Sequence, residues 1–380
     1  MDLQNAREEI DRIDDQIVAL FRERMAFSRK AAEVKQRENI PVYNGERERA
    51  VMNHVCDLAG KDLESYARVL YETLFDVSRA YQHQLIASDS TLPAEIHRAE
   101  RETAQIFPSR AVTACQGVEG AYSQCACDKL FVLPDIRYFG SFQGVFEAVE
   151  QGSCRFGVLP IENSTAGSVN QVYDLMKKHH FYIVRSIKLR VDHNLLAKKG
   201  SKLSDIKEIL SHQQAIDQCS DFLKSLKGVK VTPCANTAIA AKRVAESGRG
   251  DIAAISSRNC AELYDLSVIS DTVQNTDSNY TRFICITKDL EIYPGADKIS
   301  LMFSVAHKPG ALYSAISRFS ALGLNLTKLE SRPIPGKDFE FMFYFDLNAS
   351  IYDERVVKLL AELDDEFDQF TFLGAYSEVI

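Results

Sequence analysis

The chain has 380 residues, 46% of them apolar and 26% charged, a composition that is typical of globular proteins and excludes a largely disordered chain. This length exceeds what one hydrophobic core usually holds and indicates two or three domains. The net charge of −8 argues against nucleic acid or an anionic membrane as a partner. An anionic substrate would therefore need cations concentrated at its site.

The N-terminal residues lack the basic start and apolar core of a signal peptide, and no run of about eighteen apolar residues occurs in the sequence. We therefore expect a cytoplasmic protein. The nine cysteines are scattered and include no Cys-x-x-Cys pair. This spacing favours buried thiols over disulfides or a zinc site.

The first ninety residues predict three helices. From Leu3 to about Lys35 there is no Pro or Gly, and apolar side chains recur every three or four positions, which indicates one helix about 50 Å long. Further helices are expected from Glu46 to Leu58 and from about Ser65 to Ser88. Because a module of this size cannot bury the apolar stripe of so long a helix, we expect a homodimer of intertwined chains or a higher homo-oligomer.

Two cations, Arg24 and Lys35, fall on one face of the long helix, where its apolar stripe should continue. One interpretation is structural: Arg24 pairs with Glu48, and Lys35 extends into water. The other is a small pocket for a dianion. Arg7 points roughly 100° away from this face, so it would serve the pocket of a partner chain.

Ser78 and Gln82, four residues apart on the third helix, add two uncharged hydrogen-bonding groups on one face. Together with the charged residues they resemble the active site of the all-helical chorismate mutases, and the resemblance covers this whole segment. The matching residues are Arg7, Arg24, Lys35, Arg47, Glu48, Ser78 and Gln82. Asn44 stands where that family usually has an aspartate.

This resemblance implies that Lys35 and Gln82 are catalytic and donate hydrogen bonds to the ether oxygen of chorismate as it gains charge. It further implies that two arginines, one of them Arg7 of the other chain, hold the carboxylates. Glu48 would accept a hydrogen bond from the substrate hydroxyl. The implied chorismate-binding residues are Arg7, Arg24, Asn44, Arg47, Glu48 and Ser78.

Residues 89–109 are charged, lack a clear apolar face and predict a partly helical linker after a domain at 1–88. Beyond it, strand and helix patterns alternate from Val112 to Thr287, which indicates an α/β architecture. The run from Phe181 to Ala197 is expected to cross between two lobes with a ligand-binding cleft between them.

Several strands of this segment end in amides and hydroxyls. Asn163, Ser164 and Thr165 follow a buried strand, and they either form a turn and helix cap or contact a ligand. The loop from Gly117 to Ser123 fits neither the dinucleotide nor the P-loop spacing, so nucleotide binding is not expected. The run from Ser211 to Cys219 follows another strand, and a helix cap is the simpler interpretation there.

Together with Thr281-Arg282-Phe283, these runs resemble prephenate dehydratase across residues 110–290. The resemblance implies that Thr281 helps the ring hydroxyl of prephenate to leave, by donating a hydrogen bond. The implied prephenate-binding residues are Asn163, Ser164, Thr165, Ser211, Gln218, Thr237 and Arg282. Ala121 and Gln213 depart from that family, which usually has serine and proline there.

Residues 297–380 predict the order strand, helix, strand, strand, helix, strand of a ferredoxin-like fold. Two motifs in it need be no more than turns, but they resemble those of the ACT regulatory domain, which binds phenylalanine. The implied phenylalanine-binding residues are Gly310, Ala311, Leu312, Asn325, Leu326, Glu330, Ser331 and Arg332. Phe339 replaces a common tryptophan of that domain.

In this order the three resemblances match one multidomain architecture: an all-α chorismate mutase domain, a two-lobed α/β prephenate dehydratase domain and an α+β ferredoxin-like ACT domain. They imply a bifunctional enzyme of phenylalanine synthesis that L-phenylalanine inhibits, with no metal or organic cofactor. Two alternatives stay open. The helical segment could serve dimerisation alone, or the chain could be a non-enzymatic amino-acid sensor.

Overall fold

The computed structural model describes residues 2–86, 90–305, 307, 310–334, 336, 340–367 and 369–379. They form two compact units, which we consider separately. The first unit comprises Met1–His97 and Leu301–Phe372, and the second comprises Arg98–Ser300 and Leu373–Ile380. The predicted boundary at residues 88 and 89 lies outside the described residues.

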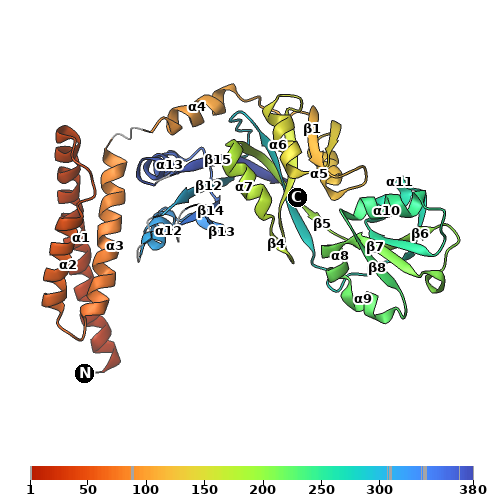
Figure 1. The fold of residues 1–380 in the computed structure, drawn as a ribbon. Coiled ribbons are helices and arrows are strands. Elements are labelled where there is room, and N and C mark those ends of the chain that lie inside the picture. The colour runs from red at the N-terminus through yellow and green to blue at the C-terminus, as the bar shows by residue number, and fades with distance from the viewer. Residues whose placement is uncertain are drawn as a thin grey trace. The chain divides into compact units, whose positions relative to one another are not determined.

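The first unit begins with the three predicted helices, α1 (Leu3–Glu38), α2 (Gly45–Ala59) and α3 (Glu64–Leu85), and α3 packs against both others (Figure 1). The Asp2 carboxylate caps α1 by accepting from the backbone N–H of Asn5 at 2.8 Å. The helix ends at Asn39, whose left-handed φ of 53° prevents its continuation. The three predicted helices are therefore confirmed, with bounds shifted by a few residues.

The apolar stripe of α1 is not covered by the described part of this chain. Ile10, Ile17 and Leu20 are 55%, 56% and 64% exposed, and Phe27 is 59% exposed. Single exposed apolar side chains are ordinary, but a stripe along one helix marks a surface that another element covers.

The first unit also holds most of the C-terminal segment. The further elements that lie wholly or partly in the first unit are α4 (Leu92–Glu102), β12 (Lys298–Ser304), α12 (Ala311–Ala321), β13 (Asn325–Pro333), β14 (Phe341–Asn348) and α13 (Glu354–Glu366). Strand β15 (Thr371–Val379) belongs to the second unit from Leu373 onward. The strand order in this unit is β13-β14-β12. Phe303 and Phe345 stack in the core at 4.6 Å between ring centroids, and Phe319 packs edge-on against Phe345. Helix α3 contacts both α12 and α13.

The larger sheet of the second unit has the strand order β15-β5-β11-β3-β1-β2, with β4 paired to β3. The strands not yet bounded are β1 (Arg110–Gln116), β2 (Leu133–Phe139), β3 (Phe156–Asn163), β4 (Gly167–Ser168), β5 (Tyr182–Arg190) and β11 (Tyr280–Thr287). Strand β11 is antiparallel to β3, in a register that sets Thr281 opposite Asn163. Both residues therefore lie at one end of the sheet.

The smaller sheet has the order β10-β6-β9-β7-β8. Its strands are β6 (Asn194–Lys198), β7 (Glu208–His212), β8 (Lys230–Cys234), β9 (Ile252–Ser256) and β10 (Leu266–Ser270). The helices of this unit are α5 (Tyr122–Leu130), α6 (Phe142–Glu150), α7 (Asn170–His179), α8 (Gln213–Gln218), α9 (Ser220–Ser225), α10 (Thr237–Glu246) and α11 (Arg258–Leu263). The predicted α/β architecture is confirmed.

Two predictions for this unit need correction. The run predicted as one crossing strand is interrupted between Arg190 and Asn194, because β5 and β6 belong to different sheets. The segment from Ala215 to Leu226, which its sequence pattern predicts to be one helix, is split at Cys219 into α8 and α9. The crossing itself is confirmed, since the chain passes there from the larger sheet to the smaller one and returns between β10 and β11.

All nine cysteines lie among the described residues and are free thiols, seven of them buried. The prediction of buried thiols without disulfides is therefore confirmed. None of the described helices carries an apolar segment of the length and composition needed to cross a membrane.

Candidate active sites

The helical site forms where the last turn of α1 meets the last turns of α3. Lys35 Nζ donates to Gln82 Oε1 at 3.0 Å and to the backbone carbonyl of Val42 at 2.6 Å. Burial lowers the pKa of Lys35, and the charge of Glu48 opposes this shift. The predicted catalytic pair is thus one hydrogen-bonded group, and Lys35 does not simply extend into water.

Ser78 fixes the orientation of the Gln82 amide. Gln82 Nε2 donates to the Ser78 carbonyl at 3.2 Å and lies 3.4 Å from its hydroxyl, which is itself 2.5 Å from the hydroxyl of Ser28. All three of these side chains are buried. The oxygen of the amide therefore faces Lys35, as the distance between Lys35 and Gln82 requires.

The structural interpretation of Arg24 is wrong. Arg24 Nη1 donates to the backbone carbonyl of Leu74 at 3.3 Å, and the partner of Glu48 is Arg79. Arg79 also pairs with Asp76 three residues before it, so it holds two carboxylates at once. The sequence reasoning missed Arg79, although its spacing from Asp76 on one helix is the usual signal of an ion pair.

The other predicted residues of this site are exposed. Arg7 lies seventeen residues before Arg24, about 25 Å away along α1, and is not part of the same pocket in this chain. Asn44 caps α2, because its side-chain oxygen accepts from the backbone N–H of Arg47 at 2.9 Å. A capping role accounts for Asn44 without any ligand.

The second site centres on Asn163 at the end of β3. Its side-chain oxygen accepts from the backbone N–H groups of Thr165 and Ala166 at 3.1 and 2.9 Å. Because a backbone N–H can only donate, these two contacts fix which end of the amide is oxygen. The amide nitrogen then donates to Asn279 Oδ1 at 2.8 Å and to the Thr281 hydroxyl at 2.9 Å.

The Thr281 hydroxyl therefore accepts from Asn163 and keeps its own proton for another acceptor. Gln218, at the end of α8 on the smaller sheet, reaches the same network. Its Oε1 accepts from Asn279 at 3.1 Å, and its Nε2 lies 3.5 Å from Asn163 Oδ1. Amides and a hydroxyl from both sheets thus converge, although they are far apart in the sequence.

The remaining predicted residues have different surroundings. Ser164 donates to the carbonyl of Ser278 at 3.0 Å and ties the turn to the segment that precedes β11. Ser211 is buried and donates to the carbonyl of Ile255 at 2.7 Å. Arg282 pairs with Glu162 at 2.7 Å across β11 and β3. This contact supports a role of Arg282 in bracing β11 against β3.

The helices that follow strands in this unit begin in different ways. Asn236 caps α10 by accepting from the backbone N–H of Ile239 at 2.7 Å, which sets Thr237 at the first helical position. His212 precedes α8 but makes no side-chain capping bond in the described structure, and the same holds for Val169 before α7. The turn at Asn163 closes back on β3 through β4 instead of capping a helix.

Two family models match the chain: chorismate mutase type II over residues 6–83 and prephenate dehydratase over residues 113–291. A bifunctional chorismate mutase/prephenate dehydratase of Aquifex aeolicus is 31% identical over 381 residues, which cover 100% of this chain and 99% of the relative. This chain belongs to the bifunctional chorismate mutase/prephenate dehydratase family. The sequence prediction of the family is confirmed.

Other relatives match a part of this chain. An arogenate dehydratase/prephenate dehydratase of Arabidopsis thaliana is 35% identical over 311 residues, 78% of this chain and 81% of the relative. A solved prephenate dehydratase structure in complex with L-Phe from Arthrobacter aurescens is 28% identical, with a TM-score of 0.64 over 70% of this chain and 90% of that chain. The bifunctional enzyme is thus an isomerase and a hydro-lyase, acting on chorismate and then on prephenate.

In the C-terminal segment of the bifunctional enzyme, the predicted phenylalanine-binding residues lie in two places. Gly310, with a left-handed φ of 81°, precedes Ala311 and Leu312 at the start of α12. On β13 the exposure alternates, so Leu326, Glu330 and Arg332 share one face, and Asn325 and Ser331 lie on the other. Residues 308–309 and Phe339 lie outside the described residues.

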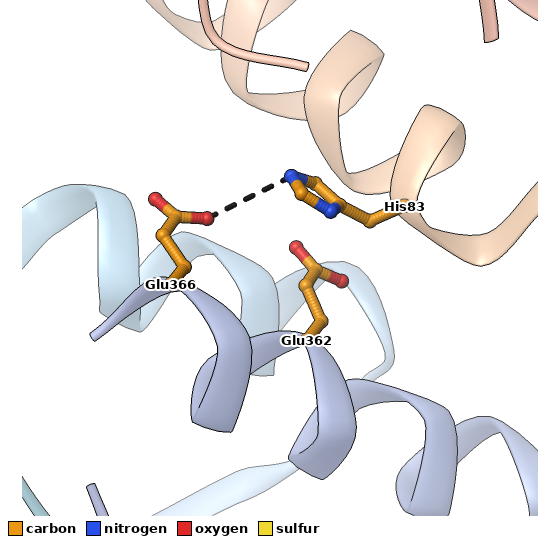
Figure 2. Close-up of side chains that lie close together, drawn as sticks. All are labelled: His83, Glu362 and Glu366. Atoms are coloured by element: carbon orange, nitrogen blue, oxygen red, sulfur yellow. Dashed lines mark ion pairs between the residues drawn. The ribbon is translucent and has the colours of Figure 1, made fainter. Parts of the chain in front are cut away.

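A cluster that the sequence reasoning missed joins α3 to α13 in the bifunctional enzyme. His83 faces Glu362 and Glu366, and the ligand-type atoms of the three lie within 4.8 Å of one another (Figure 2). Both carboxylates already pair with Arg318, at 3.1 Å for Glu362 and 2.6 Å for Glu366. A guanidinium therefore occupies the oxygens that a metal ion would need, and the cluster is better described as an ion-pair group.

Proposed function

We propose that Lys35 and Gln82 are the catalytic residues of the mutase step. The rearrangement breaks the ether C–O bond, forms a C–C bond and transfers no proton, so the site must hold the folded dianion and stabilise the charge on the ether oxygen. The hydrogen bond between Lys35 and Gln82 is the observation that carries this proposal. Because this hydrogen bond keeps a cation and an amide side by side, it also argues against the alternative that the helical segment serves dimerisation alone.

We assign Arg24 and Arg7 of a second chain to the substrate carboxylates, and Glu48 to the substrate hydroxyl. The exposed stripe of α1 supports the dimer that this assignment needs, because a second α1 would bury the stripe and carry Arg7 to the pocket. Arg79 would fix the position of the Glu48 carboxylate through their ion pair. Asn44, Arg47 and Ser78 complete the proposed chorismate-binding set, with Ser78 acting through Gln82.

We propose that Thr281 assists the dehydratase step by donating its hydroxyl proton in a hydrogen bond to the leaving ring hydroxyl. In this step the C–C bond to the ring carboxylate breaks, its electron pair makes the ring aromatic, and hydroxide leaves the opposite carbon. The observation that supports this role is that Asn163 donates to Thr281, which leaves the Thr281 proton available. The proposed prephenate-binding residues are Asn163, Ser164, Thr165, Ser211, Gln218, Thr237 and Arg282.

We propose that residues 297–380 form a ferredoxin-like ACT domain through which L-phenylalanine inhibits the enzyme. The element order β12-α12-β13-β14-α13-β15 supports the fold, and the relative solved in complex with L-Phe supports the ligand. Inhibition requires that phenylalanine bind the less active arrangement more tightly. The domain limits 1–88, 110–290 and 297–380, the linker at 89–109 and the cytoplasmic location stay predictions.

The decisive experiment adds chorismate to the purified chain and follows prephenate and phenylpyruvate together, with and without L-phenylalanine. We expect transient prephenate, then phenylpyruvate, and less phenylpyruvate when phenylalanine is present. Lys35→Ala should stop chorismate consumption and leave added prephenate convertible, whereas Thr281→Val should let prephenate accumulate. Normal phenylpyruvate formation by Thr281→Val would overturn the dehydratase assignment, and Thr281→Ser serves as its matched control.

A further inference from the structure

His193 is a buried residue of the second unit that no assignment above uses. It lies in the connection between β5 and β6, at the crossing between the two sheets, and is 2% exposed. Its backbone N–H donates to Gln274 Oε1 at 2.9 Å, and its carbonyl accepts from Val273 at 2.9 Å. Its ring Nε2 is 2.8 Å from Gln218 Oε1. The backbone is thus tied to the segment after β10 while the ring reaches the dehydratase site.

The direction of each hydrogen bond in this network follows from its fixed end. The turn after β3 fixes the Asn163 oxygen, so the Asn163 nitrogen donates to Asn279 Oδ1, and the Asn279 nitrogen donates to Gln218 Oε1. Gln218 Oε1 is therefore an acceptor. The ring of His193 must approach it as a donor, which places the imidazole proton on Nε2.

The other ring nitrogen supports this protonation state. Nδ1 of His193 is buried and has no hydrogen-bond partner among the described residues, so a proton there would be unsatisfied. Burial lowers the pKa of His193, against the opposing effects of Gln218 and of the nearby Asp192, which is paired with Arg190. The neutral ring has one proton, and Gln218 receives it.

We propose that His193 is a positioning residue of the dehydratase step, which locks the Gln218 amide so that its NH₂ group, not its oxygen, faces the substrate. An NH₂ group donates to the carboxylates of prephenate, whereas a reversed amide would present an oxygen to a negative charge. This inference rests on the proposed role of Gln218 in binding prephenate. His193 itself touches no reacting atom.

The test uses the full chain with added prephenate. His193→Leu removes the donor at nearly constant volume, and His193→Gln returns an N–H at the position of Nε2. We expect His193→Leu to lower dehydratase kcat/KM by roughly ten- to a hundredfold. His193→Gln should stay within about threefold of the parent, since one N–H donor to Gln218 is kept. His180→Gln, at an exposed histidine of the same unit, is the control.

A double-mutant cycle with Gln218→Ala separates positioning from a structural role. If His193 acts through Gln218, then His193→Leu should cost nothing further in a Gln218→Ala chain. Additive losses of kcat/KM would overturn the inference, and so would a loss in His193→Gln as large as that in His193→Leu. The thermal unfolding midpoint of each variant reports whether the second unit is folded. An inactive Thr281→Val beside a fully active His193→Leu would reject this inference and leave the proposed function intact.

Discussion

The side-chain nitrogen of Asn163 donates to the hydroxyl of Thr281 at 2.9 Å, and the register of β3 and β11 sets the two residues opposite each other. A hydroxyl that accepts one hydrogen bond can direct its proton to another acceptor. In the proposed dehydratase step, this contact leaves the Thr281 proton available for the leaving hydroxyl.

Asn163→Asp should reverse that contact. A carboxylate of the same shape has no N–H, so the Thr281 hydroxyl would donate its hydrogen bond to this carboxylate. It could then no longer donate to the leaving hydroxyl of prephenate. The carboxylate would still accept from the turn after β3, so the fold should survive. We expect dehydratase kcat to fall by roughly a hundredfold or more, with mutase activity unchanged. Asn163→Asp with normal dehydratase kcat would show that the Thr281 proton does not matter.

Lys35→Ala should lower mutase kcat by roughly a hundred- to a thousandfold, as expected when one donor to a developing oxyanion is lost. The parent enzyme should also show an alkaline fall in mutase kcat. Because burial lowers the pKa of Lys35, its charge is present below that pKa and is lost as pH rises through it, at a pH below the ordinary 10.5. Thermal unfolding midpoints of the same samples control for unfolding. A Lys35→Ala chain with parental mutase kcat would remove Lys35 from the mechanism.

Ile17→Asp should weaken the proposed dimer. Ile17 is 56% exposed on the apolar stripe of α1, so a carboxylate there costs little in the isolated chain and much in a buried interface. We expect a smaller mass by sedimentation and a mutase loss that higher protein concentration partly restores. Arg12→Asp, at an exposed and charged position of the same helix, is the matched control. An unchanged mass for Ile17→Asp would contradict the dimer through α1.

Arg332→Ala should weaken inhibition by phenylalanine and spare both activities. Arg332 shares a face of β13 with Leu326 and Glu330, the side we expect to meet the ligand. The measurement is the phenylalanine concentration that halves the dehydratase rate, and we expect it to rise about tenfold or more, the effect of losing one charge-assisted contact. Leu329→Ala, at an exposed position on the opposite face of the same strand, is the control. Full inhibition of Arg332→Ala at parental concentrations would contradict the assignment.

Glu362→Gln should flatten the pH dependence of stability. Burial raises the pKa of Glu362 to about 7, while Glu366 adds to the shift and Arg318 opposes it. The folded state therefore binds more protons than the unfolded state between the ordinary value of 4.5 and about 7, so the stability that this group contributes is lost as pH rises through that window. The loss is at most roughly 3 kcal/mol.

Thermal unfolding midpoints at pH 5, 6, 7 and 8 check this expectation. His83 has the opposite effect on stability below pH 6.5. Burial lowers its pKa from the ordinary value of 6.5, so the stability that this group contributes increases as pH rises towards that value. Glu354→Gln, at an exposed position of α13, should keep the parental profile. A parental profile in Glu362→Gln would mean that the buried carboxyl does not titrate in this range.

Much of the fold was predictable because its signals are local. The helix pattern up to Lys35 and the break at Asn39 to Pro41 need only spacing and backbone sterics. The interruption between Arg190 and Asn194 has only a short local signal, the polar residues Asp192, His193 and Asn194, which does not show that two different sheets are involved. The two halves of that run pair with different sheets, and such pairing depends on strands far away in the sequence.

The sequence by itself determined the residue types of both sites, and through them the family and its two reactions, because the chemistry of cations, amides and hydroxyls is carried by each side chain. Only the tertiary structure decided their partners. Arg79 rather than Arg24 holds Glu48, and Asn279 and His193 complete the network around Asn163. A hydrogen bond needs two groups within about 3 Å in a defined direction, and for residues distant in the sequence only the folded backbone sets that distance.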